Sequence, residues 1–250
     1  MTVSLTSIVM NDPLPWDEAA RLSALESYDI LDTPREADFD DVALLAAAAL
    51  EAPIGVVNLI ADGRQWFKAE VGIGARELPL DISICAHALL QSELMVVPDT
   101  TDDPRFSCNP LVTADEGLRF YAGALLVTPD GLPLGTVCVL DRVARPEGIT
   151  DVQRLTLTVL ARQVMTQLEL RRVLVQQRLK EKELRESETR GRLALDAADL
   201  GTWEAVPSSG MMFGDIRTRE LIGHDGNASL SYDQHLLKIH ADDRERVLSI

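Results

Sequence analysis

The first fifty residues carry apolar positions at helical spacing. Between Trp16 and Tyr28 these positions return every three or four residues, which predicts a short helix. The pattern breaks at residues 32–34, where the Asp or Thr of an Asp-Thr-Pro sequence can cap a second helix that ends before Pro53. We therefore expect two helices before the first strand.

The middle of the chain alternates between β-rich stretches and turn signals. The stretches that we expect to be strands are 54–60, 65–70, 94–97, 119–127 and 132–140. Asp62-Gly63 joins the first two as a hairpin, and Pro129-Asp130-Gly131 joins the last two. Hairpins accompanied by helices give an antiparallel sheet with helices packed on it, so the fold class is α+β.

Two further elements lie between the hairpins. Ser83 can cap a helix that reaches about Gln91. Residues 99–117 contain two proline turns and predict a long loop with one helical turn. Long loops over a compact sheet often hold ligands, so this loop is a candidate for one wall of a site.

A helical pattern without Gly or Pro continues from Thr150 to Arg190, which is typical of a coiled coil or a helix that spans a dimer. The positions that fit a heptad seam are Leu160, Val164, Leu168, Val175 and Leu179. Arg171 and Lys182 interrupt this seam, so we expect a marginal and adjustable coil. Residues 171–192 carry eight Lys or Arg and four Glu, a local charge of +4.

The pattern changes after Gly191. Residues 191–250 suggest a small helix, a strand that contains Trp203 and further short helices. About 60 residues with one or two strands are too few for an independent core. The expected organisation is a tail at 1–15, a first domain at 16–149, a connecting helix at 150–190 and an incomplete second unit at 191–250.

Composition narrows the class of protein. The 250 residues are 46% hydrophobic and 26% charged, which is typical of a globular protein. A net charge of -16 disfavours binding to nucleic acid or to anionic membranes. The longest apolar run, 42–50, is too short to span a bilayer, and we find no secretory signal at the amino terminus, so we expect a cytoplasmic protein.

The sequence Cys85-Ala86-His87 pairs two reactive side chains. In a regular helix they lie about 200° apart around the axis, so they cannot both point inward. The three cysteines are odd in number and form no Cys-x-x-Cys pair, so neither a metal site nor a disulfide framework is expected. We expect Cys85 to face inward and His87 to face neighbouring protein or solvent.

Residues 21–170 resemble a GAF domain of the bacterial sensor type. The stretches that carry the resemblance are "ILDTPREADFDDVALLAA", "RQWFKAEVG", "SICAHALL", "VVPDTTDDPRFSCNPLV" and "LRFYAGALLVTPDGLPLGTVCVLD". From about Glu188, "ALDAADLGTWE", "RTRELIG" and "LSYDQHLLKIHADDRERV" resemble the first half of a PAS domain. The order GAF, helix, PAS is similar to the sensory end of histidine kinases and of enzymes that make or degrade cyclic dinucleotides.

This resemblance implies a sensory module. A small ligand or a redox state would be detected in the GAF pocket and relayed through a homodimer formed by the 150–190 helix to PAS and to an output domain. The chain contains no kinase or cyclase motif, so catalysis would belong to a downstream kinase domain or, as a weaker expectation, to a cyclic-dinucleotide cyclase or phosphodiesterase.

In GAF folds the ligand lies between the sheet and the loops. The candidates for that pocket are Cys85, Asp99, Asp102, Arg105, Phe106, Phe120, Tyr121, Thr136, Cys138 and Trp66. Alternation sends Phe120 and Tyr121 to opposite faces of the sheet, while Thr136 and Cys138 share one face. Arg105 either ties the loop down by pairing with Asp99 or Asp102, or closes over a ligand.

Lysine and histidine side chains and the bilin-type Cys-His pair give further expectations. Lys68 could approach the pocket, but a solvated edge charge is the simpler interpretation. Ala86 separates the Cys-His pair that bilin-binding GAF domains carry side by side, so no covalent bilin is expected. His224, His235 and His240 are expected to cap or pack.

Two alternative functions stay open from the sequence. One is a thiol oxidoreductase of the free methionine sulfoxide reductase kind, which also has a GAF fold and would use Cys85. The other is a dimerisation scaffold without a ligand. The natural ligand and any cofactor stay unknown.

Overall fold

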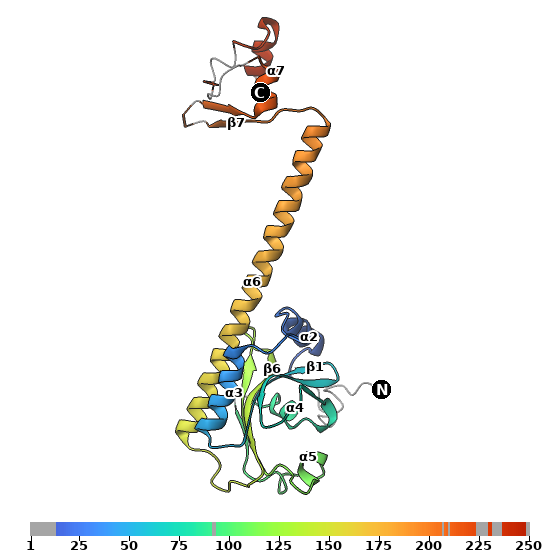
Figure 1. Ribbon diagram of the computed structural model, residues 1–250, viewed down its shortest axis with the longest axis vertical. Coiled ribbons are helices and arrows are strands. Elements are labelled where there is room, and N and C mark those ends of the chain that lie inside the picture. Colours follow the sequence, from blue (N-terminus) through green and yellow to red (C-terminus); the bar gives the residue numbers. More distant parts are fainter. Residues whose placement is uncertain are drawn as a thin grey trace. The chain divides into compact units, whose positions relative to one another are not determined.

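The computed structural model describes residues 14–91, 94–206, 208–209, 211–223, 230–231 and 237–248. The chain divides into two compact units, Met1–Gln177 and Arg178–Ile250. The boundary falls inside one helix, α6 (Asp151–Ala197), which begins in the first unit and continues into the second (Figure 1).

The first unit is built on a six-stranded sheet. Its strands are β1 (Ile54–Ala61), β2 (Arg64–Val71), β3 (Glu77–Pro79), β4 (Leu94–Val97), β5 (Phe120–Val127) and β6 (Pro133–Asp141). They lie in the order β3-β2-β1-β6-β5-β4, and every neighbouring pair is antiparallel. The predicted α+β class with an antiparallel sheet is confirmed. The sequence pattern missed β3, which has only three residues.

The helices of this unit are α2 (Glu18–Glu26), α3 (Ala37–Ala49), η1 (Leu80–Ile82), α4 (Ile84–Ala88), α5 (Pro110–Thr113) and the first part of α6. Ser83 caps α4 as expected, since its hydroxyl accepts the amide hydrogen of Ala86 at 3.0 Å. The predicted cap of α3 at residues 32–34 is wrong. The helix begins three residues beyond Pro34, and the Thr33 hydroxyl donates to the Ile30 carbonyl at 2.6 Å.

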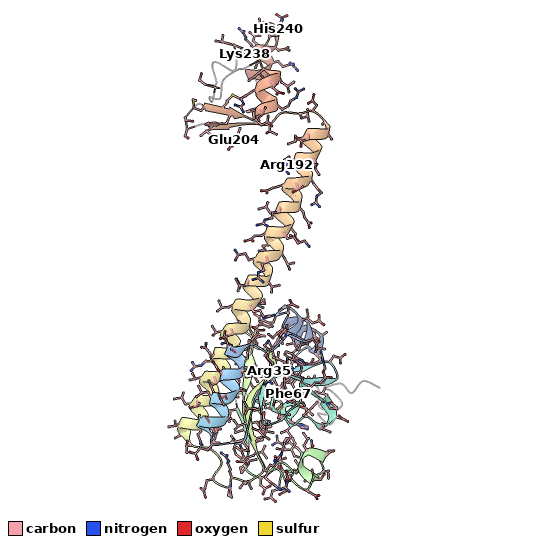
Figure 2. The ribbon with its side chains drawn as sticks, in the orientation of Figure 1. Arg35, Phe67, Arg192, Glu204, Lys238 and His240 are labelled. Carbon is pink, nitrogen blue, oxygen red and sulfur yellow. The ribbon has the colours of Figure 1, made fainter. Side chains whose placement is uncertain are left out.

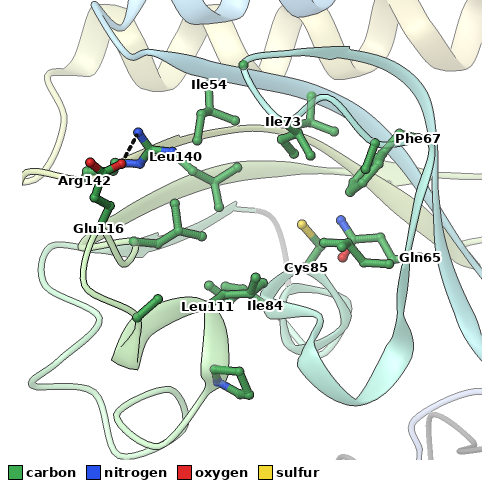
Figure 3. A pocket seen from close by; sticks show the side chains of 17 residues that line it. Ile54, Gln65, Phe67, Ile73, Ile84, Cys85, Leu111, Glu116, Leu140 and Arg142 are labelled. Carbon is green, nitrogen blue, oxygen red and sulfur yellow. Dashed lines mark ion pairs between the residues drawn. The ribbon is translucent and has the colours of Figure 1, made fainter.

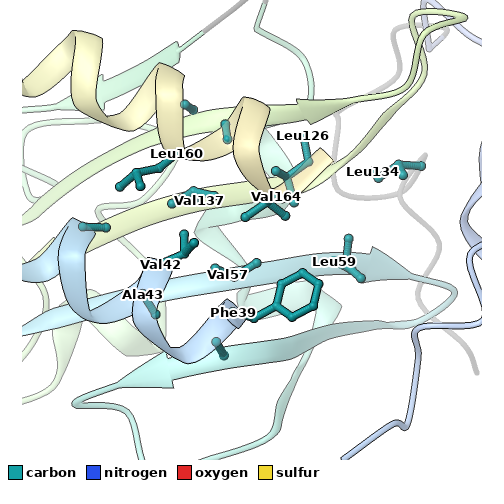
Figure 4. Close-up of a cluster of buried hydrophobic side chains, with 14 of the residues drawn as sticks. Phe39, Val42, Ala43, Val57, Leu59, Leu126, Leu134, Val137, Leu160 and Val164 are labelled. Atoms are coloured by element: carbon teal, nitrogen blue, oxygen red, sulfur yellow. The ribbon is translucent and has the colours of Figure 1, made fainter. Parts of the chain in front are cut away.

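Helices α3 and α6 cover one face of the sheet. The buried residues of α6 that join this core are Leu157, Leu160, Ala161, Val164, Met165 and Leu168. They meet Val57, Val137 and other strand residues in the cluster shown in Figure 4. An amphipathic helix buries its apolar stripe against the nearest apolar surface, and here that surface is the sheet of its own chain.

This packing takes three of the five residues out of the predicted coiled-coil seam. Leu160, Val164 and Leu168 are buried in the core of their own unit. Arg171, which interrupts the seam in the sequence, pairs with Glu36 at 3.1 Å. Other apolar residues of α6 within the first unit are exposed, namely Val152, Leu155, Val159, Leu170, Val173 and Leu174. Of the remaining seam residues, Val175 is half-buried and Leu179 is exposed, so both stay available for contact with a second helix.

The second unit holds a small antiparallel sheet and short helices. Its described elements are β7 (Trp203–Val206), β8 (Met211–Gly214), β9 (Leu230–Ser231), α7 (Ile216–Leu221), η2 (Ala241–Asp243) and α9 (Arg244–Leu248). Asp215 caps α7 and accepts a hydrogen bond from the Thr202 hydroxyl at 2.7 Å. His240, labelled in Figure 2, is exposed, whereas His224 and His235 lie outside the described residues.

Residues 176–194 of α6 are all exposed in the single chain. Among the described residues, no helix is both long enough and apolar enough to cross a membrane.

Candidate functional site

A cavity of about 340 Å³ lies on the face of the sheet opposite α3 and α6. It is enclosed by β1, β2 and β6 on one side and by α4 and α5 on the other (Figure 3). Its apolar walls include Ile54, Val56, Phe67, Ile73, Leu78, Ile84, Leu111, Leu118 and Leu140. Clefts of this size with apolar walls and a few polar groups are typical of small-molecule sites.

Polar groups occupy two places in this cavity. Gln65 of β2 and Cys85 of α4 lie together, and both are buried. Glu116 and Arg142 lie apart from them and form an exposed ion pair of 3.3 Å, drawn as a dashed line in Figure 3. A ligand would therefore meet neutral hydrogen-bonding groups at one place and charges of both signs at another.

The polar groups are held by local structure. Ser83, the cap of α4, donates from its hydroxyl to Gln65 Oε1 at 2.5 Å and so joins β2 to the start of that helix. The loop after β2 is fixed by Glu70, whose Oε2 accepts the amide hydrogens of Ile73 at 3.1 Å and Gly74 at 2.9 Å. Burial raises the pKa of Glu70, but the two amides and Arg35 outweigh it and hold this pKa below its usual value.

Two buried thiols lie next to each other, and one of them lines this cavity. Cys85 Sγ lies 3.6 Å from Cys138 Sγ on β6, and the Asn58 amide nitrogen lies 3.4 Å from the first sulfur and 3.6 Å from the second. Asn58 also donates to Thr136 Oγ1 at 2.7 Å. The Tyr121 hydroxyl lies 3.5 Å from the same oxygen. The strands thus surround the sulfur pair with hydrogen-bonding groups.

A glycine makes room for this arrangement. A Cβ atom added at Gly123 would lie 2.4 Å from the Tyr121 hydroxyl oxygen and 2.8 Å from Cys138 Cβ. Only a residue without a side chain lets the tyrosine ring lie across β5 toward β6. The small residues in the sequence Phe-Tyr-Ala-Gly-Ala are therefore part of how the site is built.

The two thiols differ in acidity. Burial raises the pKa of Cys85, but hydrogen bonds from Cys138, Thr136, Tyr121 and Gln65 outweigh it and bring this pKa below its usual value. Burial and the neighbouring Cys85 sulfur raise the pKa of Cys138 well above its usual value. Negative charge in the pair is therefore favoured on Cys85, the sulfur that lines the cavity.

The structure brings four of the predicted site residues together and separates the others. Cys85, Tyr121, Thr136 and Cys138 form the group just described, and of these Cys85 lines the cavity. Trp66 and Phe120 belong to the core on the α3 and α6 side, so they do not form its wall. Alternation placed Phe120 and Tyr121 on opposite faces correctly, but it could not say which face would meet the helices.

The predicted loop residues are tied to each other. Arg105 pairs with Asp103 at 2.6 Å, which corrects the expected pairing with Asp99 or Asp102. Its guanidinium lies 4.9 Å from the centre of the buried Phe106 ring. Asp99 accepts from the Thr101 hydroxyl at 2.7 Å, within its own turn, and Asp102 is exposed. None of these residues lines the described cavity.

His87 lies apart from the sulfur pair. Its ring meets Phe106 edge to face, with ring centres 5.0 Å apart. The side chain is half-buried, and burial lowers its pKa. Cys85 faces inward and His87 contacts neighbouring protein, as the helical geometry predicts. Within the described part of the chain, no group of three or more His, Cys, Asp or Glu side chains is arranged to hold a metal ion.

The expectation for Lys68 is wrong, because this side chain is only 1% exposed. Its ammonium donates to Thr33 Oγ1 at 2.9 Å and to the Pro34 carbonyl at 2.8 Å, and it pairs with Glu36 at 2.5 Å. Glu36 also binds Arg171 of α6 at 3.1 Å. We call this set, Lys68, Glu36 and Arg171, the α6 clamp.

Sequence reasoning missed several residues of the site and the clamp. Asn58 interrupts the otherwise apolar run Ile-Gly-Val-Val-Asn-Leu-Ile-Ala, and a polar residue inside a buried strand is the signal that could have identified it. Gln65, Glu116 and Arg142 carry no comparable signal, because polar residues near strand ends and in loops are ordinary. Lys68 is the extra residue of a β-bulge against β1, a feature without a sequence signature here.

Comparison with known proteins gives one curated relative. Over 133 residues, 53% of this chain, the sequence is 38% identical to a cyclic di-GMP phosphodiesterase of Pseudomonas aeruginosa. The chain spans only 23% of the length of that relative. A scan against protein-family models finds none that matches.

Solved structures of similar fold include GAF domains. The GAF domain of an Acinetobacter phosphoenolpyruvate-protein phosphotransferase has a TM-score of 0.45 at 15% identity, covering 61% of this chain and 92% of its own. A domain of a Sinorhizobium meliloti two-component sensor histidine kinase has a TM-score of 0.44 at 21% identity, covering 56% and 94%.

A third similar structure is an enzyme. The free methionine-R-sulfoxide reductase of Neisseria meningitidis has a TM-score of 0.44 at 17% identity, covering 64% of this chain and 95% of its own. Fold likeness of this degree does not distinguish a sensor from an enzyme.

Proposed function

We propose that the first unit is a GAF-type sensory domain that binds a small, largely apolar molecule in the cavity. The observation that carries this proposal is the cavity of about 340 Å³ with apolar walls and only two polar places. A space of this size accommodates one small molecule. Charge-paired Glu116 and Arg142 suit a ligand with a polar or charged end, and Gln65 can bond to a second polar group.

The α6 clamp supports a route from this cavity to α6. Phe67 lines the cavity, and the next residue of β2, Lys68, lies on the opposite face. A ligand that displaces Phe67 strains the same strand segment that holds Lys68, and Lys68 is joined through Glu36 to Arg171. Binding then biases α6 if the first unit has two conformations that hold α6 differently and bind the ligand with different affinity.

For the output, the curated relative supports a protein that degrades cyclic di-GMP. The sequence alone favours a histidine kinase, with cyclic-dinucleotide enzymes as the weaker expectation. An identity of 38% over 133 residues to a phosphodiesterase supports this output activity over that of a histidine kinase. The resemblance of residues 191–250 to half of a PAS domain fits either output, since both follow sensory modules.

We propose further that this chain forms a homodimer. Leu44 and Leu45 of α3 are about half exposed, as are Leu170, Val173 and Leu174 of α6. A long helix with exposed leucines that is otherwise highly charged is typical of a chain that pairs with a second copy.

The binding proposal is tested with 8-anilinonaphthalene-1-sulfonate, an aromatic anion that suits apolar walls beside Arg142. We expect saturable binding of one dye per chain, measured by fluorescence titration. Ile73→Trp fills part of the cavity and should weaken this binding by about tenfold or more. The matched control is Leu221→Trp, on an exposed position of α7. Equal affinity in all three proteins would contradict the proposal.

The two alternatives are tested separately. Turnover of free methionine sulfoxide with a thiol reductant, lost in Cys85→Ala, would support the oxidoreductase. Native mass spectrometry of freshly purified protein without a retained small molecule, together with no dye binding, would support the scaffold.

A further inference from the structure

The sulfur pair has the geometry of a dithiol. Cys85 Sγ and Cys138 Sγ are 3.6 Å apart, and both residues are at most 2% exposed. They come from different elements, since Cys85 lies on α4 and Cys138 on β6. The third cysteine, Cys108, is exposed.

The cavity gives the two sulfurs unequal access. Cys85 is one of the lining residues, and Cys138 is not. Figure 3 shows the Cys85 sulfur beside Gln65, away from Glu116 and Arg142. A small reagent that enters therefore meets Cys85 first, and Cys138 can react only with what forms on Cys85.

We propose that Cys85 and Cys138 form a redox pair that closes into an intramolecular disulfide when a hydroperoxide enters the cavity. Cys85 is the attacking sulfur and Cys138 is the resolving sulfur. This is a modification site for which the oxidant is a small organic or inorganic hydroperoxide. This chemistry does not depend on the proposed sensory role. If the first unit is a sensor, oxidation of the pair is a signal that it detects.

The reaction balances in two steps. The Cys85 thiolate attacks the terminal oxygen of the hydroperoxide, an S–O bond forms, the O–O bond breaks, and the leaving alkoxide takes a proton to become an alcohol, or water when the oxidant is hydrogen peroxide. The Cys138 sulfur then attacks the Cys85 sulfur, the S–O bond breaks, and hydroxide leaves with the thiol proton as water. Two thiols lose two electrons, and one peroxide gains them.

The surroundings of the sulfurs fit these roles. Asn58 points its amide nitrogen at both sulfurs, and the Tyr121 and Thr136 hydroxyls lie close by, so a thiolate at Cys85 is stabilised in a buried place. The lower pKa of Cys85 and the raised pKa of Cys138 agree with the order of attack. The reactive thiolate is the one that the cavity exposes.

Closing the disulfide requires a small movement. A disulfide has a sulfur separation of about 2.05 Å, so the two sulfurs must approach by about 1.5 Å. β6 is fixed by β1 on one side and β5 on the other, whereas α4 has five residues. The movement therefore belongs to α4, which carries Ile84 and Cys85 of the cavity wall, and oxidation should reshape the cavity.

The experiment uses the full chain with Cys108→Ser, which removes the exposed thiol. This protein is treated with hydrogen peroxide or cumene hydroperoxide, quenched with iodoacetamide, unfolded and digested. We expect one cross-linked peptide pair joining Cys85 to Cys138, lighter by two hydrogens than the reduced pair and restored by dithiothreitol.

Two variants in this background assign the roles. Cys138→Ala should leave a sulfenic acid at Cys85 that dimedone traps. Cys85→Ala should slow oxidation of Cys138 by about tenfold or more, because the cavity no longer presents a reactive sulfur. Circular dichroism checks that each variant is folded.

Absence of the cross-linked peptide, with both cysteines still alkylated after unfolding, would overturn the proposal, as would equal oxidation of Cys138 in Cys85→Ala. The cross-link in the Cys108→Ser protein needs neither of the buried variants, so a folding defect in them does not decide the result. Dye binding is measured separately, so failure of the ligand proposal and failure of this one are distinct outcomes.

Discussion

At the scale of single residues, the cavity depends on side chains whose polar atoms are satisfied by backbone groups. Glu70 is the clearest case, because its carboxylate holds the Ile73 and Gly74 amides while Arg35 pairs with its other oxygen. The loop that it fixes contributes Gly72 and Ile73 to the cavity wall. A carboxylate outside the cavity thus sets the shape of one side of it.

Glu70 should make stability depend on acid pH. Its pKa in the folded protein is below the ordinary 4.5, so its stabilising contribution is complete above that pH and is lost as the pH falls through the folded value. Glu70→Gln should lower the free energy of unfolding at pH 7 by about 1 kcal/mol and flatten its decline below pH 4.5. Urea unfolding at several pH values measures both. An unchanged pH profile would contradict this role, and Glu147→Gln is the matched control.

Gly123 should not tolerate a side chain. An added Cβ would lie 2.4 Å from the Tyr121 hydroxyl oxygen and 2.8 Å from Cys138 Cβ, so ring and strand must both shift. We expect Gly123→Ala to destabilise the protein by about 1 to 3 kcal/mol, measured by urea unfolding. Gly191→Ala is the control, because its Cβ meets nothing within 4 Å and alanine favours helix. Equal stability of the two variants would contradict the close packing at Gly123.

At the scale of elements, β2 contributes side chains to the cavity on one face of the sheet and to the α6 clamp on the other. Gln65 and Phe67 face the cavity, while Trp66 and Lys68 face the helices. The β-bulge at Lys68 is where the strand changes its pairing with β1. Local irregularity of this kind is a common way to aim one side chain at a particular partner.

Cutting the α6 clamp should loosen α6 where it leaves the first unit. Lys68→Met removes the buried ammonium, and Glu36 then has Arg171 alone as its ion-pair partner in the clamp. We expect faster amide hydrogen exchange at residues 169–177, measured by mass spectrometry, with little change at residues 157–165. Lys180→Met, on the exposed part of α6, is the control. If exchange at residues 169–177 is the same in Lys68→Met as in Lys180→Met, the clamp does not hold α6 and the proposed relay through it is contradicted.

Two substitutions that the sequence treats alike should behave differently. The interrupted heptad predicts that leucine at position 171 or 182 strengthens a coil. Arg171, however, bonds to Glu36 and to the Asp29 carbonyl, whereas Lys182 is 73% exposed. We expect Arg171→Leu to destabilise the first unit and Lys182→Leu to leave it unchanged, by thermal unfolding. The same effect of both changes on this unit would support the original coil pattern.

At the scale of the whole chain, the division at residue 177 predicts that the first unit folds without the second. The first unit contains the complete sheet, both faces of its core and the cavity. The fragment of residues 1–177 should therefore unfold cooperatively and bind 8-anilinonaphthalene-1-sulfonate with the affinity of the full chain, measured by calorimetry and fluorescence titration. Loss of binding in a folded fragment would show that the second unit completes the site.

The sequence by itself determined the local elements. The helical period, the turn residues at 62–63 and 129–131 and the Ser83 cap depend on neighbours along the chain, so they could be predicted. The same is true of the opposite facing of Cys85 and His87, which follows from the turn of a helix. Alternation likewise separated Phe120 from Tyr121.

The tertiary structure alone decided what each face meets. Alternating and heptad patterns predict that one face of a strand or helix is apolar. They do not predict whether α6, a second chain or a ligand covers that face. Leu160, Val164 and Leu168 are buried against the sheet of their own chain. Trp66 and Phe120 belong to the same core, so they lie away from the cavity. The sulfur pair and the α6 clamp join residues far apart in the chain, because long-range contacts form only when the sheet brings distant strands together.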